Sequence, residues 1–285
     1  ARGTAITDEF VDAIFMQRSG MQRWMLDETE PVEPEKLHET IAGKLIGQSA
    51  AVDALTDVLH TIRAGLTPAR RPFASMLFIG PTGVGKTEAA KVLSGMLYED
   101  PDALVRIDMN EYVDAGAASR LIGDLWRPEG VLTGRLRHRP FCVLLLDEIE
   151  KAHPAVHDLL LQVLDEGRLT DSLGRTVDFS RAVILLTSNV GATEAGRSMG
   201  FDRDSAAVEA TYRAALSRTF RPEFLNRIGR VVVFQPLMKA DIHAITRLQL
   251  GRLLHREGLQ RRTVILEIHP GAIDAIAAAG FNPTM

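Results

Sequence analysis

The chain has 285 residues, of which 46% are hydrophobic and 25% are charged, as in globular proteins of one or two domains. Its formal net charge of -4 argues against a strongly basic nucleic-acid surface, and no apolar run reaches the length of a membrane span. The single cysteine, Cys142, excludes an internal disulfide and lies in an apolar run, so we expect it in the core of a cytoplasmic protein.

The first 36 residues are charged and contain prolines, with one short helical stretch at Asp8–Met16. This pattern predicts that residues 1–36 form a connector. From Gln48 onward, apolar residues recur at helical spacing until Gly65, which predicts the first long helix.

Five short apolar runs follow, with helical patterns between them. They are Met76–Ile79, Leu104–Ile107, Phe141–Leu146, Ala182–Leu186 and Val231–Phe234. Because these runs are apolar on both faces and alternate with helices, they predict an α/β fold with a parallel five-stranded sheet flanked by helices. Active groups are then expected at the carboxyl ends of the strands.

The loop after the first predicted strand fits the phosphate-binding pattern G-x-x-x-x-G-K-[ST]. In such a loop backbone N–H groups face phosphate oxygens, the lysine reaches the β- and γ-phosphates, and the hydroxyl can bind Mg²⁺. We therefore predict that the chain binds a nucleotide with Mg²⁺. The expected binding residues are Gly80, Pro81, Thr82, Gly83, Val84, Gly85, Lys86, Thr87 and Glu88, with Leu45 and Ile46 beside the base.

A second motif is the apolar run 144–146 followed by two carboxylates. Asp147 is expected to hold Mg²⁺, and Glu148 to orient and polarise the attacking water. The alternative is that the pair caps a helix. One strand further on, Asn189 is expected either to lie between Glu148 and the γ-phosphate or to form a turn.

Beyond Phe234 the pattern changes to two helices, at Lys239–Glu257 and Pro270–Ala279, with a strand between them at Thr263–Ile268. We therefore predict two domains after the connector. Residues 37–235 form the nucleotide-binding αβ domain, and residues 236–285 form a small, partial, mainly helical lid domain.

Six motifs occur in one order along the chain, at residues 80–87, 106–112, 146–154, 167–171, 174–179 and 220–227. Together they resemble the second ATPase module of Clp-type AAA+ unfoldases, in the ClpC and ClpA branch. The resemblance implies the AAA+ fold, bound ATP or ADP with Mg²⁺, and a homo-oligomeric ring, usually a hexamer. Such a ring hydrolyses ATP to thread unfolded or tagged protein substrates through its channel.

The resemblance also assigns roles to residues. Lys86 and Glu148 would act in hydrolysis, Asn189 would be the sensor-1 residue, and Arg227 would be the arginine finger that reaches the neighbouring subunit's nucleotide. An isolated subunit is therefore expected to hydrolyse ATP poorly. The alternative for Arg227 is a surface pair with Glu223.

The chain departs from the family pattern in two places. Where the family carries a pore-loop tyrosine, this chain has a shorter loop whose aromatic residue is Trp126. Trp126 is expected either to grip substrate in the channel or to pack against the core. The chain also stops at Met285, before an arginine of the family, and residues 1–36 resemble a linker after a first module, so we expect a piece of a longer protein.

A polar loop at 191–205 contains the tripeptide Met199, Gly200 and Phe201. It resembles the tripeptide by which some members dock on a ClpP-type peptidase, although it could also anchor the loop. The main expectation is therefore an unfoldase that feeds such a peptidase. The alternatives are a protease-independent disaggregase, a nucleotide-regulated scaffold that has lost threading, and, disfavoured by the acidity, a nucleic-acid motor.

Overall fold

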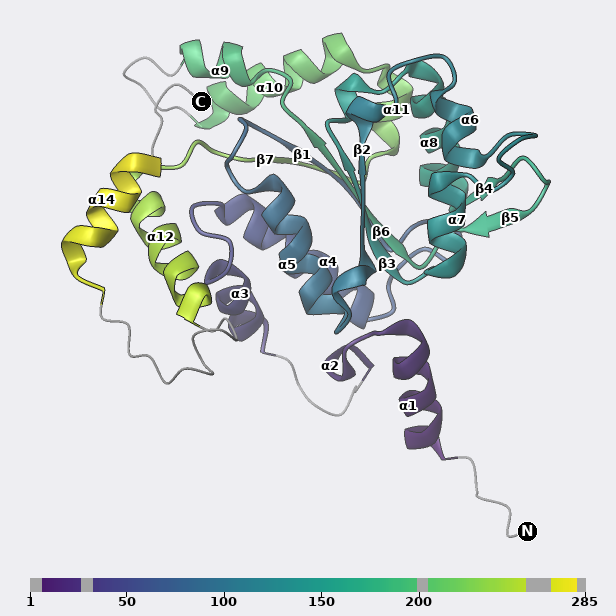
Figure 1. Ribbon diagram of the computed structural model, residues 1–285, viewed down its shortest axis with the longest axis horizontal. Helices are drawn as coiled ribbons and strands as arrows, with labels where there is room; N and C mark the ends of the chain where they lie inside the picture. Colours follow the sequence, from purple (N-terminus) through teal and green to yellow (C-terminus); the bar gives the residue numbers. More distant parts are fainter. Residues whose placement is uncertain (1–6, 27–32, 199–204, 255–267, 281–285) are drawn as a thin grey trace.

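A five-stranded parallel sheet forms the centre of the computed structural model, which describes residues 7–26, 33–198, 205–254 and 268–280 (Figure 1). The strand order is β2-β3-β6-β1-β7, and every neighbouring pair is parallel. This confirms the predicted α/β fold. The strands are β1 (Ala74–Ile79), β2 (Leu104–Asp108), β3 (Cys142–Asp147), β6 (Ala182–Ser188) and β7 (Arg230–Val233).

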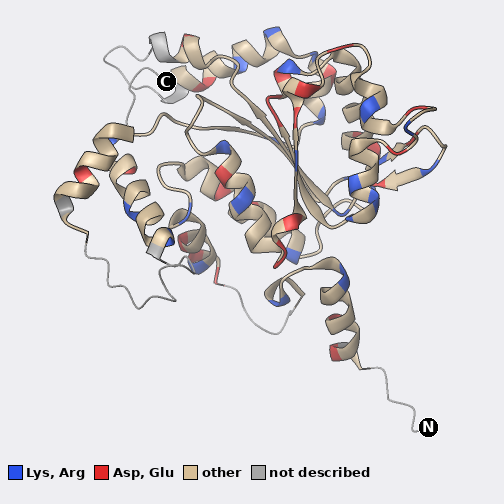
Figure 2. Ribbon diagram, viewed as in Figure 1, with Lys and Arg blue, Asp and Glu red and all other residues tan. Residues whose placement is uncertain are grey.

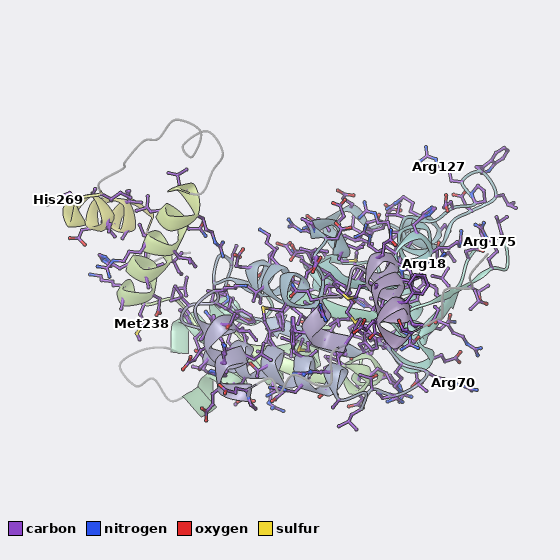
Figure 3. The ribbon with its side chains drawn as sticks, turned by 90° about the horizontal axis from the view of Figure 1, so that it is seen from below. Arg18, Arg70, Arg127, Arg175, Met238 and His269 are labelled. Carbon is purple, nitrogen blue, oxygen red and sulfur yellow. The ribbon has the colours of Figure 1, made fainter. Side chains whose placement is uncertain are left out.

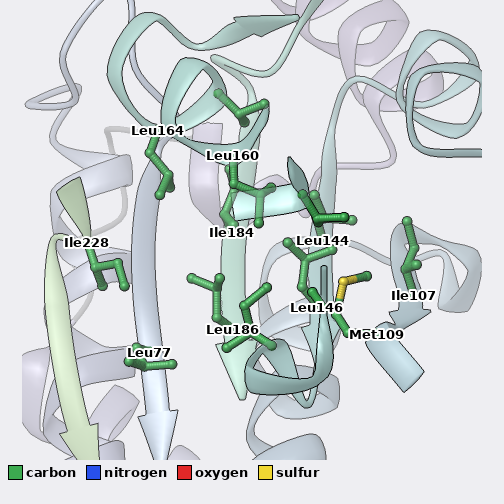
Figure 4. Close-up of a cluster of buried hydrophobic side chains, with 14 of the residues drawn as sticks. Leu77, Ile107, Met109, Leu144, Leu146, Leu160, Leu164, Ile184, Leu186 and Ile228 are labelled. Carbon is green, nitrogen blue, oxygen red and sulfur yellow. The ribbon is translucent and has the colours of Figure 1, made fainter. Parts of the chain in front are cut away.

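Helices cover both faces of the sheet, so successive side chains of a strand enter two different cores (Figure 1). In β1, Leu77 packs in one core and Phe78 in the other, and both are fully buried. All residues of β3 and β6 are buried, which explains why these strands are apolar at every position. Figure 4 shows side chains of the first core, among them Leu144 and Leu186 of the sheet and Leu160 of helix α8.

The helices form two groups. On the face shown in Figure 4 lie α6 (Ala117–Ile122), α7 (Val131–His138), α8 (Pro154–Glu166), α10 (Ser205–Thr219) and α11 (Pro222–Arg227), with α9 (Ala192–Ser198) beside α10. On the other face lie α2 (Arg23–Leu26), α3 (Pro34–Ala42), α4 (Ser49–Arg63) and α5 (Lys86–Leu97). The long helix predicted after Gln48 is thus confirmed as α4.

The sequence did not predict a small antiparallel hairpin, β4 (Arg168–Thr170) and β5 (Thr176–Asp178). Each of its strands has three residues with only the middle one buried, so its apolar signal is too short to recognise. The strand boundaries also shift by one or two residues from those predicted. Polar Asp108, Asp147 and Ser188 end β2, β3 and β6, and of these Asp147 lines the site described below.

The predicted connector packs partly against the sheet domain. Helix α1 (Asp8–Ser19) contacts it through Phe15, whose ring meets Phe141 at 5.4 Å, and Met21 and Met25 are buried in the second core. Helix α3 begins at Pro34 and so crosses the predicted boundary at residue 37. The domain boundaries themselves stay predictions.

Two helices form the described part of the predicted lid, α12 (Lys239–Leu254) and α14 (Pro270–Gly280), which pack on each other (Figure 1). The strand predicted at 263–268 falls almost wholly outside the described residues. Acidic and basic residues are interspersed over the helices (Figure 2). Within the described ranges, no helix is long and apolar enough to cross a membrane.

Candidate active site

The loop between β1 and α5 requires glycine at two positions for different reasons. A β-carbon on Gly80 would lie 2.6 Å from the carbonyl oxygen of Phe234, so only glycine permits this close approach. Gly85 precedes α5 with a φ of 106°, a conformation that other residues rarely adopt. The loop therefore brings the N-terminus of α5, with its unpaired N–H groups, to the end of the sheet, where it can bind phosphate.

Lys86 is an almost fully buried ammonium group surrounded by neutral acceptors. Its Nζ donates to the carbonyl oxygens of Gly80 and Pro81, at 2.6 and 2.7 Å, and to Oδ1 of Asn189 at 2.7 Å. Burial lowers the pKa of Lys86 to about 8, although the charges of three nearby carboxylates, Glu150 first among them, act in the opposite direction. An anionic phosphate that replaced these neutral partners would satisfy the buried charge.

Asp147 ends strand β3 and is held from both neighbouring strands. Nη2 of Arg106, on β2, lies 2.6 Å from its Oδ2, and the hydroxyl of Thr187, on β6, donates to its Oδ1. Both contacts follow from the sheet order, because β3 lies between β2 and β6. The carboxylate is therefore fixed at the carboxyl end of the sheet.

Glu148 has a φ of 55°, and it is the one described residue other than glycine with positive φ. Such a conformation costs about 1–3 kcal/mol and is found mainly at functional sites. The backbone N–H of Glu148 donates to the Thr187 hydroxyl at 3.0 Å. Its carboxylate accepts from the side-chain amides of Asn110, at 2.9 Å, and Asn189, at 3.3 Å. The strained turn thus presents a carboxylate that two neutral donors orient without neutralising it.

Asn189 is held at its backbone as well as at its side chain. Its N–H donates to Oε1 of Glu150 at 2.9 Å, while its side chain bridges Lys86 and Glu148. The amide therefore links Lys86 to the second carboxylate. This geometry agrees with the expected position of Asn189, whose role in sensing nucleotide stays a prediction.

These groups line one cavity of about 370 Å³. Most of the predicted nucleotide and metal residues lie in its wall, together with Lys91, Arg106 and Thr187, which were not predicted. The predicted residues there are Thr82, Gly83, Gly85, Lys86, Thr87, Glu88, Asp147, Glu148 and Asn189. Gly80 and Pro81 contribute through their carbonyl contacts with Lys86.

The donor set of the cavity suits Mg²⁺. Thr87 supplies a hydroxyl and Asp147 a carboxylate, and Mg²⁺ prefers such hard oxygen ligands together with phosphate oxygens and water. The surrounding cations, Lys86 and Arg106, match the charge of a polyphosphate. The residues therefore fit a magnesium nucleotide.

Leu45, Ile46 and Val84 lie outside the wall of this cavity. Leu45 and Val84 are buried, and a β-carbon on Gly85 would lie 3.6 Å from Leu45. Their placement near the base stays a prediction. Gln48 belongs to the same short segment as Leu45 and Ile46 and is 3% exposed, but the sequence did not predict the contacts that it makes.

Gln48 fastens the phosphate-binding loop to the segment after β7. Its Nε2 donates to the carbonyl oxygens of Val84, at 3.1 Å, and Gln235, at 2.8 Å, and its Oε1 accepts the Gln235 N–H at 2.9 Å. A buried amide with both ends paired resists displacement. The signal available in the sequence was only a glutamine just before a helix.

Arg227 is the last residue of α11 and lies away from the cavity of its own chain. Its Nη2 is 3.2 Å from Oδ2 of Asp165 on α8, and its side chain is half exposed. This guanidinium therefore forms an ion pair with α8, whereas the sequence suggested Glu223 as the alternative partner. Its action on a neighbouring subunit stays a prediction.

Trp126 is 92% exposed, so the expectation that it packs against the core is wrong. Its neighbour Leu125 is 94% exposed. The tripeptide Met199, Gly200 and Phe201 lies outside the described residues, so its predicted docking role stays untested.

A family model for the AAA domain (Cdc48 subfamily) matches residues 71–231, which include both motifs of the cavity. The chain belongs to this family. As an AAA+ ATPase module of the Clp type, it is 43% identical over 283 residues to the chaperone protein ClpB of Pseudomonas putida and 42% identical to ClpB 1 of Synechococcus elongatus. Each comparison covers 98% of this chain and about a third of the relative.

Solved structures agree with this assignment. A complex of S. cerevisiae Hsp104 with casein matches 98% of this chain and 48% of that chain, with a TM-score of 0.84 and 33% identity. The fold of the AAA+ module, its parallel sheet with flanking helices, is thereby established. The finer expectation of a ClpC or ClpA branch has no support in these relatives, which are named ClpB and Hsp104.

The Thr187 hydroxyl offers a direct test of the site. In Thr187→Val we expect ATP turnover to fall about tenfold and stability to fall by about 1–3 kcal/mol, because the Glu148 N–H and the Asp147 carboxylate each lose a partner. Steady-state hydrolysis and chemical unfolding measure the two effects. Thr187→Ser retains the hydroxyl and is the control; equal losses in both variants would contradict a role for the hydroxyl.

Proposed function

We propose that this chain is the ATP-hydrolysing motor module of a ring-forming protein disaggregase. The observation that carries the proposal is that Lys86, Glu148 and Asn189 line one cavity. The same cavity contains the oxygen ligands that suit Mg²⁺. The relatives named as ClpB chaperones favour a disaggregase, because the chain matches them over nearly its whole length.

Bound ATP with Mg²⁺ would supply the γ-phosphoryl group that is transferred to water. On this proposal Lys86 would exchange its carbonyl partners for phosphate oxygens, and Thr87 and Asp147 would hold the metal. Glu148, oriented by Asn110 and Asn189, positions and polarises the water. Arg227 acts in the same reaction on the neighbouring subunit's nucleotide.

A contact between the lid and the sheet domain would couple this chemistry to movement. Nη1 of Arg252, on α12, lies 2.7 Å from Oε1 of Glu88 in the first turn of α5. Because α5 begins at the phosphate-binding loop, a change at the nucleotide would reach the lid through this pair, while Gln48 joins the same loop to Gln235, just before the lid. Hydrolysis would then reposition the lid relative to the sheet.

A ClpP-type peptidase has less support as a partner. The relatives are named ClpB, and the predicted docking tripeptide lies outside the described residues. The proposal therefore takes the protease-independent alternative. It retains a hexameric ring, unfolded protein substrates and a cytoplasmic location, and the negative net charge still disfavours nucleic acid.

The chain spans about a third of the length of its curated ClpB relatives, so the test uses the full-length protein. Heat-aggregated luciferase is the substrate, and recovery of its activity is followed with and without ATP. We expect recovery that requires ATP. ATP hydrolysis without any recovery would overturn the disaggregase proposal and favour a nucleotide-regulated scaffold.

Trp126 provides the second test of this proposal. In Trp126→Ala we expect the recovery of luciferase activity to fall at least about tenfold, because the large exposed ring that would contact the substrate is lost. Trp126→Phe keeps an aromatic ring and should retain most of the recovery. Leu66→Ala removes another well-exposed apolar side chain, 75% exposed, and controls for surface hydrophobicity. Unchanged recovery in Trp126→Ala would show that substrate is gripped elsewhere.

A further inference from the structure

The loop between α6 and α7, residues 123–130, carries its two most exposed apolar side chains, Leu125 and Trp126, on a closed turn. Oδ1 of Asp124 accepts the backbone N–H groups of Trp126, at 2.8 Å, and Arg127, at 2.6 Å. The Asp124 N–H in turn donates to the Arg127 carbonyl oxygen at 2.9 Å. One aspartate thus closes the tip of the loop around the exposed tryptophan.

This loop lies beside the turn of the β4–β5 hairpin, residues 171–175. Figure 3 shows Arg127 of the loop and Arg175 of the hairpin projecting at the same end of the molecule. Ser172 joins the two segments: its hydroxyl lies 3.2 Å from the Pro128 carbonyl oxygen and 3.5 Å from that of Asp124, and its N–H donates to the Ile122 carbonyl oxygen at 3.2 Å. A single serine therefore contacts both stems of the loop and its tip.

A buried carboxylate holds the hairpin turn in place for this contact. Asp171 has a fully inaccessible side chain that accepts from the guanidinium groups of Arg137 and Arg175 and from the N–H groups of Leu173 and Arg175. Burial alone would raise the pKa of Asp171, but these hydrogen bonds outweigh it and lower the pKa to about 2. The carboxylate is therefore charged at neutral pH.

Arg137, on α7, links the same two segments. Its Nη1 lies 3.3 Å from the carboxylate of Glu129 in the loop, while its Nη2 pairs with Asp171 in the hairpin. The close packing is also visible at Gly123, where a β-carbon would lie 2.3 Å from the Pro128 carbonyl oxygen and 2.9 Å from the Ser172 hydroxyl. The loop cannot move away from the hairpin without breaking these contacts.

We infer that the loop 123–130 and the hairpin turn 171–175 form one rigid unit, and that Ser172 is the positioning residue that presents Trp126 to apolar segments of an unfolded polypeptide. The inference rests on the proposed function for its substrate. Fixing the loop in advance removes part of the entropic cost of ordering it that binding would otherwise incur. The loop is shorter than the pore loop of the family, but because it is held in this way the single ring of Trp126 can bind the polypeptide.

The experiment reads the rigidity of Trp126 and the affinity for polypeptide separately. This chain has two tryptophans, so Trp24→Phe, together with replacement by Phe of every tryptophan that the full-length protein carries outside this chain, leaves Trp126 as the single tryptophan for time-resolved anisotropy. In that background Ser172→Ala removes the hydroxyl, and Ser172→Thr retains it as the matched control. The affinity of the same full-length variants for fluorescein-labelled casein is measured by titration in the presence of a slowly hydrolysed ATP analogue.

We expect Ser172→Ala to increase the fast, nanosecond part of the Trp126 depolarisation and to weaken casein binding about 3- to 10-fold. Ser172→Thr should resemble the wild type in both measurements. Unchanged anisotropy in Ser172→Ala would overturn the rigid unit, and a mobile Trp126 with unchanged casein affinity would overturn the positioning role. Failure of the wild type to bind casein would overturn the substrate in the proposed function, while the anisotropy would still decide on the rigid unit.

Discussion

Glu148→Gln is expected to lower ATP turnover by about 10²- to 10⁴-fold, the usual contribution of a general acid or base. Glutamine preserves the shape of the side chain but removes the negative charge that polarises water. The two amides that orient Glu148, from Asn110 and Asn189, leave that charge intact in the wild type. Phosphate release under saturating MgATP measures the loss.

Nucleotide binding should survive this change, because the groups that hold phosphate and metal are different residues. Titration with a fluorescent ADP analogue in the presence of Mg²⁺ should give an affinity within about threefold of the wild type. Glu111→Gln makes the same chemical change on an exposed side chain next to Asn110 and is the matched control. Turnover above a tenth of the wild-type rate in Glu148→Gln would contradict the assigned role.

The sheet and its phosphate-binding loop could be predicted from the sequence because burial on both faces leaves an unambiguous pattern. The residues of β3 and β6 are all buried, so their apolar runs stand out from the polar sequence around them. The loop could be recognised from the glycines at positions 80 and 85, because the backbone at each of these positions disfavours any other residue. The local sequence was enough to predict a feature wherever that feature depends on a single element, such as a buried strand or a glycine turn.

The partners of these groups could not be predicted, because they depend on the order of strands in space. Arg106, Thr187 and Asn110 reach the two carboxylates only because β2, β3 and β6 are adjacent. An arginine inside an apolar strand gives no sign of which carboxylate it will meet. Glu150, two residues after Glu148, likewise meets its partner, the Asn189 backbone N–H, only because β3 and β6 are adjacent.

The loop with Trp126 illustrates the same limit at the surface. Its sequence allowed the ring either to pack inward or to face the solvent, since a single aromatic residue in a polar loop fits both. The structure decides between them through Asp124 and Ser172, which fix the backbone so that the ring projects outward. The contact with Ser172 joins segments more than forty positions apart, which no local pattern reports.

Arg227→Ala is expected to reduce turnover by as much as about 10³- to 10⁵-fold, the range for arginines that stabilise the charge of phosphoryl transfer. The guanidinium is half exposed at the end of α11 and pairs with Asp165 rather than with the cavity of its own chain. Its loss should therefore leave nucleotide binding intact, as measured by the same ADP titration. Arg221→Ala is the matched control, since Arg221 precedes the same helix and pairs with Asp158 at 3.1 Å.

A mixture of two inactive variants separates action on a neighbouring subunit from action within one chain. Glu148→Gln retains Arg227, and Arg227→Ala retains Glu148, so a mixed ring contains interfaces at which an intact Glu148 site faces an intact arginine. If Arg227 acts on its neighbour, the mixture hydrolyses ATP faster than either variant alone. If Arg227 acts in its own chain, every site lacks one group and the mixture stays as slow as its components. The outcome therefore decides between two roles for the half-exposed Arg227. It either forms only a surface ion pair with Asp165, or it acts on the nucleotide of the neighbouring subunit.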